Sequence, residues 1–186
     1  MLKEVPILVF GDRTSSVVDM AKKIGLGEEW VVGDPMNANV NAIVSPANTI
    51  GDMSGGYDLV IRNKLGSHVE DLAIESLRHS ELPMGGARAI KTQSSIPWMI
   101  IVPTVVGSLS GGNTQVGSLQ SKTPIDVIER GAYNMMMEAY RNNIPRLGSV
   151  LLGGGVGGVL KDKAIRAMFD GYMKAFDEID ELIWGS

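Results

Sequence analysis

Short apolar runs of strand length alternate with amphipathic runs of helix length along most of the chain. Strands are predicted at residues 5–10, 29–32, 40–46, 87–92, 97–103 and 148–152. Helices are predicted at residues 15–24, 57–66, 68–79, 123–142 and 161–180, with Val60 and Ile125 facing inward and Thr123 as a helix cap. The segment Ala42-Ile43-Val44 is apolar throughout, as in a strand covered on both faces. The order of elements predicts an α/β fold of three α/β/α layers around a mixed sheet of six or slightly more strands.

Composition excludes several classes of protein. The chain has 186 residues, 44% of them hydrophobic, and a net charge of −4, so it is not a disordered chain and suits one domain over residues 1–186. No apolar run reaches the roughly 18 residues that cross a bilayer. Cysteine is absent, which excludes disulfides and a thiolate nucleophile. Residues 1–6 do not begin a signal peptide, so we expect a cytoplasmic protein without membrane partners.

The charge balance also bears on ligands. A pI of about 5.2 argues against binding duplex nucleic acid, which depends on clustered Lys and Arg. A small anion is still a possible ligand, because backbone N–H groups can hold a phosphate without any positive side chain.

Glycine is in excess, with 23 residues, and several of these gather where predicted strands end. Residues 153–158 (GGGVGG) lie between a strand and a helix, where glycines let the backbone approach an anion closely. This predicts a phosphate cradle; the alternative is a tight turn, which one or two glycines would satisfy. The segment is not a Walker A loop, because no Gly-Lys-Ser/Thr follows it.

A second cluster follows the predicted strand at 40–46. It contains Ser45-Pro46-Ala47-Asn48 and then Gly55-Gly56-Tyr57-Asp58. The Asn48 carboxamide could bind a diol, and Asp58 could activate water as a general base. The N-terminus of the following helix favours an ionised Asp58. Taken singly, Asn48 could instead be a turn residue and Asp58 a helix cap.

Together these segments resemble the macro domain family. Gly33-Asp34 precedes the Ala-Ile-Val-Ser-Pro-Ala-Asn strand at the expected interval, and the late glycine segment at 153–158 follows. The resemblance covers residues 28–180, with residues 1–27 as an additional strand and helix. It is greatest to small bacterial and phage proteins, which have an Ile-Pro-Trp strand like that at 96–102.

The resemblance implies a macro-domain-like fold and an ADP-ribose site. Asp34 would bind the adenine amino group, Asn48 would orient the distal ribose, and Asp58 would activate water or the ribose. The implied catalytic residues are therefore Asp58 and Asn48. The implied substrate-binding residues are Asp34, Ala47, Gly55, Gly56, Tyr57, Gly153, Gly154, Gly155, Val156 and Gly157. The resemblance implies no metal and no cofactor.

Three residues depart from the family pattern. Pro35 replaces a frequent Ile and removes a backbone donor to adenine. Gly157 stands where many hydrolytic members have an aromatic residue, and Tyr57 replaces a small or aliphatic one. Asp58 favours an enzyme that removes ADP-ribose from protein, or hydrolyses ADP-ribose 1″-phosphate or O-acetyl-ADP-ribose. Gly157 favours the alternative, a non-catalytic module that binds ADP-ribose or a related nucleotide. An unrelated α/β nucleotide-binding protein is the third alternative.

Two further features have ordinary interpretations. His68 and His79 are expected on the surface of a helix, and no third ligand is spaced to complete a metal site with them. The polar segment at 104–122 is long for a connection, which indicates a functional or mobile loop.

Overall fold

The structure is a computed structural model that describes residues 1–107, 123–154 and 159–185. The strands are β1 (Ile7–Asp12), β2 (Glu29–Val32), β3 (Ala42–Asn48), β4 (Arg88–Lys91), β5 (Trp98–Val105) and β6 (Arg146–Ser149). The helices are α1 (Ser15–Ile24), α2 (Gly56–Leu65), α3 (His68–His79), α4 (Ile125–Arg141) and α5 (Lys161–Trp184), with a short 3-10 helix η1 (Pro35–Asn37). No helix of the described residues is long and apolar enough to cross a membrane.

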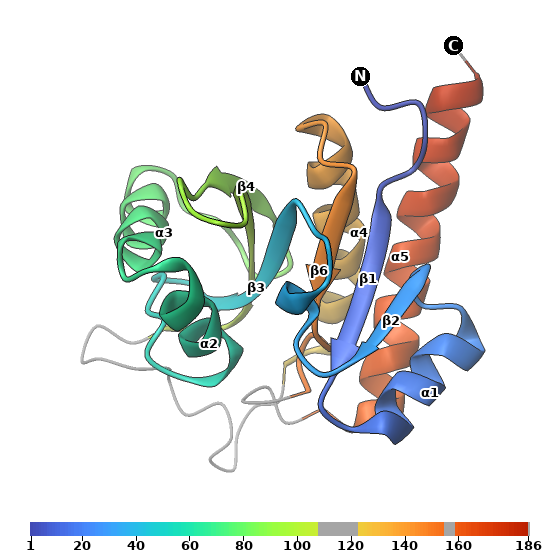
Figure 1. Cartoon of the computed structure of the whole chain (residues 1–186), viewed down its shortest axis with the longest axis horizontal. Coiled ribbons are helices and arrows are strands. Elements are labelled where there is room, and N and C mark those ends of the chain that lie inside the picture. The colour runs from blue at the N-terminus through green and yellow to red at the C-terminus, as the bar shows by residue number, and fades with distance from the viewer. Residues whose placement is uncertain (108–122, 155–158, 186) are drawn as a thin grey trace.

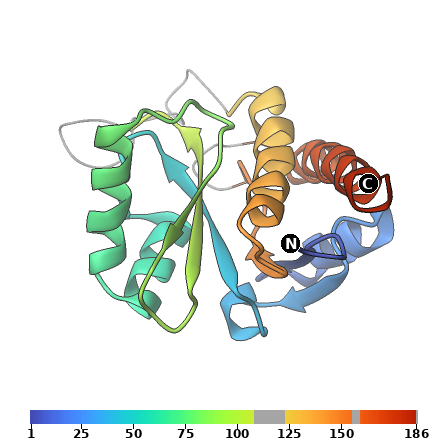
Figure 2. The ribbon, with the colours of Figure 1, turned by 90° about the horizontal axis from the view of Figure 1, so that it is seen from above.

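The strands form one six-stranded sheet in the order β2-β1-β6-β3-β5-β4. β1 pairs in parallel with β2 and β6, β3 pairs in parallel with β5 and β6, and only β4 runs antiparallel, against β5. Five strands therefore end at the same edge of the sheet. The predicted mixed sheet and α/β class are confirmed, and Figures 1 and 2 show helices on both faces of the sheet.

Alternate residues of the central strands enter two separate cores. Leu8 and Phe10 belong to the core under α1, α4 and α5, whereas Val9 belongs to the core under α2, α3 and η1. β3 alternates in the same way, with Ala42 and Val44 in the first core and Ile43 in the second. This two-residue period is the geometry of a strand that is buried on both faces, as the apolar run at 42–44 predicted.

Several predicted details differ from the structure. The last predicted strand, 148–152, begins earlier, at Arg146, and ends at Ser149. Val60 and Ile125 are not inward-facing but 43% and 45% exposed. In α2 a polar residue, Asp58, takes the buried position one turn before Ile61, which leaves Val60 on the outer side. Thr123 does not cap α4, because its hydroxyl donates to the Thr104 carbonyl instead.

Helices α4 and α5 cross closely at a glycine. A Cβ placed on Gly171 would lie 2.0 Å from the Glu129 carbonyl oxygen and 3.0 Å from the Ala132 Cβ. Backbone atoms cannot move aside as a flexible side chain can, so an alanine there would push the two helices apart. The contact matters to the site because both helices begin at the sheet edge where the strands end (Figure 1).

We predict that Gly171→Ala lowers the free energy of unfolding by about 2 kcal/mol, since overpacking outweighs the roughly 1 kcal/mol gain in helix propensity. Urea denaturation would measure it. Gly131→Ala in α4 is the matched control, because its Cβ would meet the side chain of Val102, at 2.8 Å, and not backbone atoms, and its loss should be smaller. An unchanged or increased stability of Gly171→Ala would contradict the prediction.

Candidate functional site

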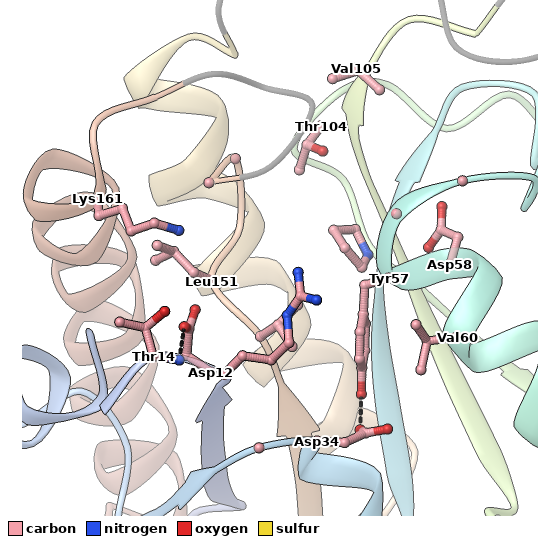
Figure 3. Close-up of a pocket in the computed structure, with 18 residues that line it drawn as sticks. Asp12, Thr14, Asp34, Tyr57, Asp58, Val60, Thr104, Val105, Leu151 and Lys161 are labelled. Carbon is pink, nitrogen blue, oxygen red and sulfur yellow. Dashed lines mark hydrogen bonds between the residues drawn. The ribbon is translucent and has the colours of Figure 1, made fainter. Parts of the chain in front are cut away.

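A cavity of about 450 Å³ opens at the edge of the sheet where the parallel strands end. Its lining comes from the last residues of β1, β3 and β5, from the segments after β1, β2, β3 and β6, and from the first residues of α2 and α5 (Figure 3). This is where ligands bind in open α/β sheets. The lining residues are Asp12, Arg13, Thr14, Gly33, Asp34, Pro46, Gly55, Gly56, Tyr57, Asp58, Val60, Thr104, Val105, Val150, Leu151, Gly153, Gly154 and Lys161.

The structure brings most of the sequence-predicted residues into this cavity. Both glycine clusters and the two aspartates meet there, although more than 90 residues separate Asp58 from Gly153. Asn48 and Ala47 do not line it: both are buried, at 1% and 4% exposure, and lie behind the lining. Gly155, Val156 and Gly157 lie outside the described residues, as does most of the predicted functional loop, at 108–122.

Asp58 is a buried carboxyl with a hydroxyl partner. It lies in the first turn of α2, is 5% exposed, and accepts a hydrogen bond of 2.6 Å from the Ser45 hydroxyl. Ser45 comes from β3, where the alternation of the strand turns its side chain toward α2. The second Asp58 oxygen accepts no hydrogen bond from the described residues and is available to a ligand in the cavity.

Burial sets the protonation of Asp58. Desolvation raises its pKa from an ordinary 3.8 to about 7; the Ser45 hydrogen bond lowers it, and the charges of Asp52 and Glu70 raise it. Burial thus opposes the helix N-terminus, which favours the ionised form of Asp58, and the loss of water is the larger effect. A carboxyl that titrates near pH 7 can both accept and donate a proton under physiological conditions.

Asp34 and Tyr57 form the opposite end of the site. The Tyr57 hydroxyl donates to Asp34 Oδ1 at 2.5 Å, and the Met36 N–H donates to the same oxygen at 2.8 Å. Burial and the Asp34 carboxylate raise the pKa of Tyr57 well above its usual value, so Tyr57 remains a hydrogen-bond donor. Neither described bond goes to Asp34 Oδ2, which leaves an acceptor at this end of the cavity (Figure 3).

Pro35 has a structural role in the same loop. It is the first residue of η1, whose N-cap is Asp34, and it is buried against β1 and β6. A Cβ on Gly11 would lie 2.7 Å from the proline ring, and one on Gly148 would lie 3.2 Å from it. These two strand glycines make room for Pro35, which fixes the loop that presents Asp34.

Asn48 organises the loop between β3 and α2. Its side-chain carbonyl accepts the N–H groups of Ile50, Gly51 and Asp52 at 2.8–3.2 Å, and its amide donates to the Asp52 carbonyl. Gly51 has φ of +85°, and a Cβ there would meet the Ile74 backbone at 2.9 Å. The loop is thereby held against α3, which fixes where Gly55 and Gly56 approach the cavity.

Glycine is required by the fold at one of the two glycine segments that line the cavity and not at the other. Gly153 needs it for the fold, because its φ is +76° and a Cβ would lie 2.6 Å from the Ile128 side chain. Gly55 does not: its φ of −151° suits any residue, and no described atom lies within 4 Å of the Cβ position. The space beside Gly55 is open and can be occupied by a ligand.

Sequence analysis missed the wall formed by Asp12, Arg13, Thr14 and Lys161. Asp12 is the last residue of β1, Arg13 and Thr14 follow it, and Lys161 begins α5 after the late glycine segment. The signal was present in the sequence, since residues that follow parallel strands share the edge at which ligands bind. Residues 1–27 were treated as an addition to the site-forming part, and Asp12 to Thr14 were passed over for that reason.

Comparisons with known proteins agree with this fold. A family model described as Macro domain matches residues 44–168, which is more than half of the chain. An uncharacterised protein of Aquifex aeolicus is 26% identical over 142 residues, covering 75% of this chain and 77% of its own.

Two solved structures illustrate the likeness in fold. The macrodomain of Mycobacterium tuberculosis DarG superposes with a TM-score of 0.61 at 18% identity, over 80% of this chain and 88% of its own. Thermosipho africanus DarTG in complex with ADP-ribose superposes with a TM-score of 0.61 at 20% identity, over 78% of this chain and 38% of its own.

The raised pKa of Asp58 predicts a specific pH dependence of stability. Between pH 4 and pH 7 the folded protein holds a proton that the unfolded chain lacks, so the free energy of unfolding falls as pH rises and levels above about pH 7. Asp58→Asn should remove this fall. Its free energy of unfolding relative to that of the wild type should therefore rise by roughly 2–4 kcal/mol from pH 4 to pH 8. Urea denaturation at both pH values measures it, and an equal effect at both would contradict it.

The partners of Asp58 should move its pKa in opposite directions. Ser45→Ala removes a donor to the carboxylate and should raise the pKa of Asp58, whereas Asp52→Asn removes a neighbouring negative charge and should lower it. Carboxyl carbon chemical shifts followed by NMR through a pH titration would report both. Shifts of the same sign in the two variants would show that the causes are misassigned.

Proposed function

The chain belongs to the macro domain family, and on that premise we propose that its cavity binds ADP-ribose or a derivative and hydrolyses a bond at the distal ribose. One observation carries the proposal: a single cavity joins an acceptor at Asp34, open space along Gly55, and a buried carboxyl at Asp58 whose pKa is about 7. The ADP-ribose complex of Thermosipho africanus DarTG, which shares the fold, supports the choice of ligand.

The ligand would lie across the cavity from Asp34 to Asp58. Asp34 Oδ2 accepts a hydrogen bond from the adenine amino group, while Tyr57 holds the other oxygen in place. The diphosphate passes between Gly55 and Gly56 on one side and Gly153 and Gly154 on the other. In this arrangement Asn48 acts on the distal ribose through the loop that it holds, since its amide already bonds the Asp52 carbonyl.

Asp58 acts as the general base. The ionised carboxylate takes a proton from a water molecule, whose oxygen attacks the anomeric carbon of the distal ribose as the bond to the leaving group breaks. Asp58 then returns the proton to the leaving group, so one water is consumed and the ionised carboxylate of Asp58 is regenerated. Ser45 keeps the carboxyl oriented throughout. Because the ionised form is required, the rate should rise with pH up to about 7.

A non-catalytic ADP-ribose-binding module is the second candidate. It is favoured by the burial of Asp58, which is 5% exposed and hydrogen-bonded to Ser45, as a residue that only holds α2 to β3 would be. Both candidates bind the same ligand, and they differ in turnover alone.

The test is calorimetry with ADP-ribose, followed by release assays on mono-ADP-ribosylated protein, ADP-ribose 1″-phosphate and O-acetyl-ADP-ribose. Asp58→Asn should lower turnover at least about 100-fold and change the Kd for ADP-ribose less than threefold, because a general base supplies the rate and not the affinity. Asp19→Asn, at an exposed position of α1 outside the cavity lining, is the matched control and should keep most of the activity.

The outcomes separate the candidates. Binding by the wild type without turnover of any of the three substrates would leave the binding module. Turnover by Asp58→Asn at a rate close to that of the wild type would show that another residue acts as the general base. No binding of ADP-ribose would contradict both candidates.

A further inference from the structure

Most of one wall of the cavity comes from a part of the chain outside the family match. Asp12 ends β1 and Arg13 and Thr14 follow it, whereas the Macro domain model begins at residue 44. Lys161, at the start of α5, lines the cavity from the same side as Asp12 and Thr14 (Figure 3). Tyr57, Asp58 and Val60 lie across the cavity from them.

This wall carries the positive charge of the site. Arg13 and Lys161 are the cationic side chains among the described residues that line the cavity. Neither forms an ion pair or a side-chain hydrogen bond with any residue in the described part of the chain, whereas Arg62, Arg130, Arg146 and Arg166 are each paired with an acid. Their charges are therefore available to a ligand.

The neighbouring carboxylates of Asp12 and Asp34 form no ion pair with these two cations among the described residues. Asp12 Oδ1 accepts the Thr14 N–H at 2.8 Å, which fixes the turn into α1, and Asp34 Oδ1 is held by Tyr57 and Met36. With Asp58, these aspartates give the cavity three acidic groups. An anionic ligand that enters such a cavity is repelled by these acidic groups, and a positive charge on the wall offsets that repulsion.

We propose that Arg13 and Lys161 form a cationic subsite that binds a phosphate group of the nucleotide and makes the protein select phosphorylated ligands over neutral nucleosides. The inference rests on the proposed function, because it assigns further specificity residues to the same cavity. It departs from the expectation that backbone N–H groups of residues 153–157 hold the phosphates unaided.

The subsite has a measurable consequence for affinity. A guanidinium or ammonium that pairs with a phosphate forms a charge-assisted hydrogen bond, and at a partly exposed site its loss weakens binding by about fivefold. Removing both should weaken phosphate-dependent binding by roughly 20-fold at low ionic strength. The effect should shrink as salt is added, because the pair is open to solvent.

The experiment compares Arg13→Gln/Lys161→Gln with the control Lys23→Gln/Lys163→Gln. The control removes the same charge from α1 and α5 at exposed positions that do not line the cavity. Calorimetry at low and high salt would measure binding of ADP, adenosine and inorganic pyrophosphate. The cavity double variant should bind ADP roughly 20-fold more weakly and adenosine within twofold of the wild type, and the control should bind both normally.

The three probes distinguish failure of this inference from failure of the proposed function. If the wild type binds ADP and the cavity variant binds it equally well, the subsite is wrong and the proposed function stands. If the wild type binds pyrophosphate but neither ADP nor adenosine, and the cavity variant loses pyrophosphate, the subsite stands and the nucleotide assignment fails. If adenosine binding falls as far as ADP binding, the two residues shape the cavity and the subsite is wrong. If the wild type binds none of the probes, both proposals fail.

Discussion

The parallel pairing of β3 with its two neighbours is the constraint on which the site depends. β3 is hydrogen-bonded to β5 from Ala42 to Asn48 and to β6 at Ala42 and Ile43. Because the three strands run the same way, their last residues meet at one edge, and segments distant in sequence become opposite walls of a cavity. The same strand also positions the hydroxyl partner of Asp58, because the alternation of its side chains turns Ser45 toward α2, where it donates a hydrogen bond to Asp58.

Much of the fold could be predicted because its signals are local. The strand at 42–44 is apolar on both faces, and the helix at 161–180 shows its buried residues at helical spacing, so both were found. The residues at which strands end, and the residues of each helix that face the core, were harder to predict. Val60 was assigned to the core because it is apolar, but the buried turn of α2 is taken by the polar Asp58, which only its contact with Ser45 explains.

The site was predictable in part, for a similar reason. Residues 55–58 and 153–154 lie next to strands and carry glycine or acid patterns that stand out, and the structure brings them together. Asn48 also stood out, yet its hydrogen bonds to Ile50, Gly51 and Asp52 depend on how the loop folds back on the strand. Arg13 and Lys161 carry no motif. They were missed because a single cation has meaning only once its position on the cavity wall is known.

Asp58 is the residue at which local preference and tertiary structure disagree. The first turn of a helix favours a carboxylate, whereas burial at 5% exposure favours the neutral acid, and burial is the larger effect. A fold selected for stability alone would place an apolar residue here, as at Ile61 one turn later. Keeping a buried carboxyl in the core lowers stability, which is the pattern expected where a chain needs a group that exchanges protons near neutral pH.

The other end of the cavity is built on the opposite principle, which is rigidity. Asp34 is held through one oxygen by a backbone N–H and by a tyrosine hydroxyl that stays protonated, and Pro35 is held in place by the space at Gly11 and Gly148. The proline removes one backbone donor, but it also removes freedom that binding would otherwise have to freeze. An acceptor fixed before the ligand arrives loses less entropy on binding, so this end is suited to affinity. The proposed function thereby assigns affinity and proton transfer to opposite ends of one cavity, so a change at Asp34 is expected to act on binding and to leave the contact between Ser45 and Asp58 in place.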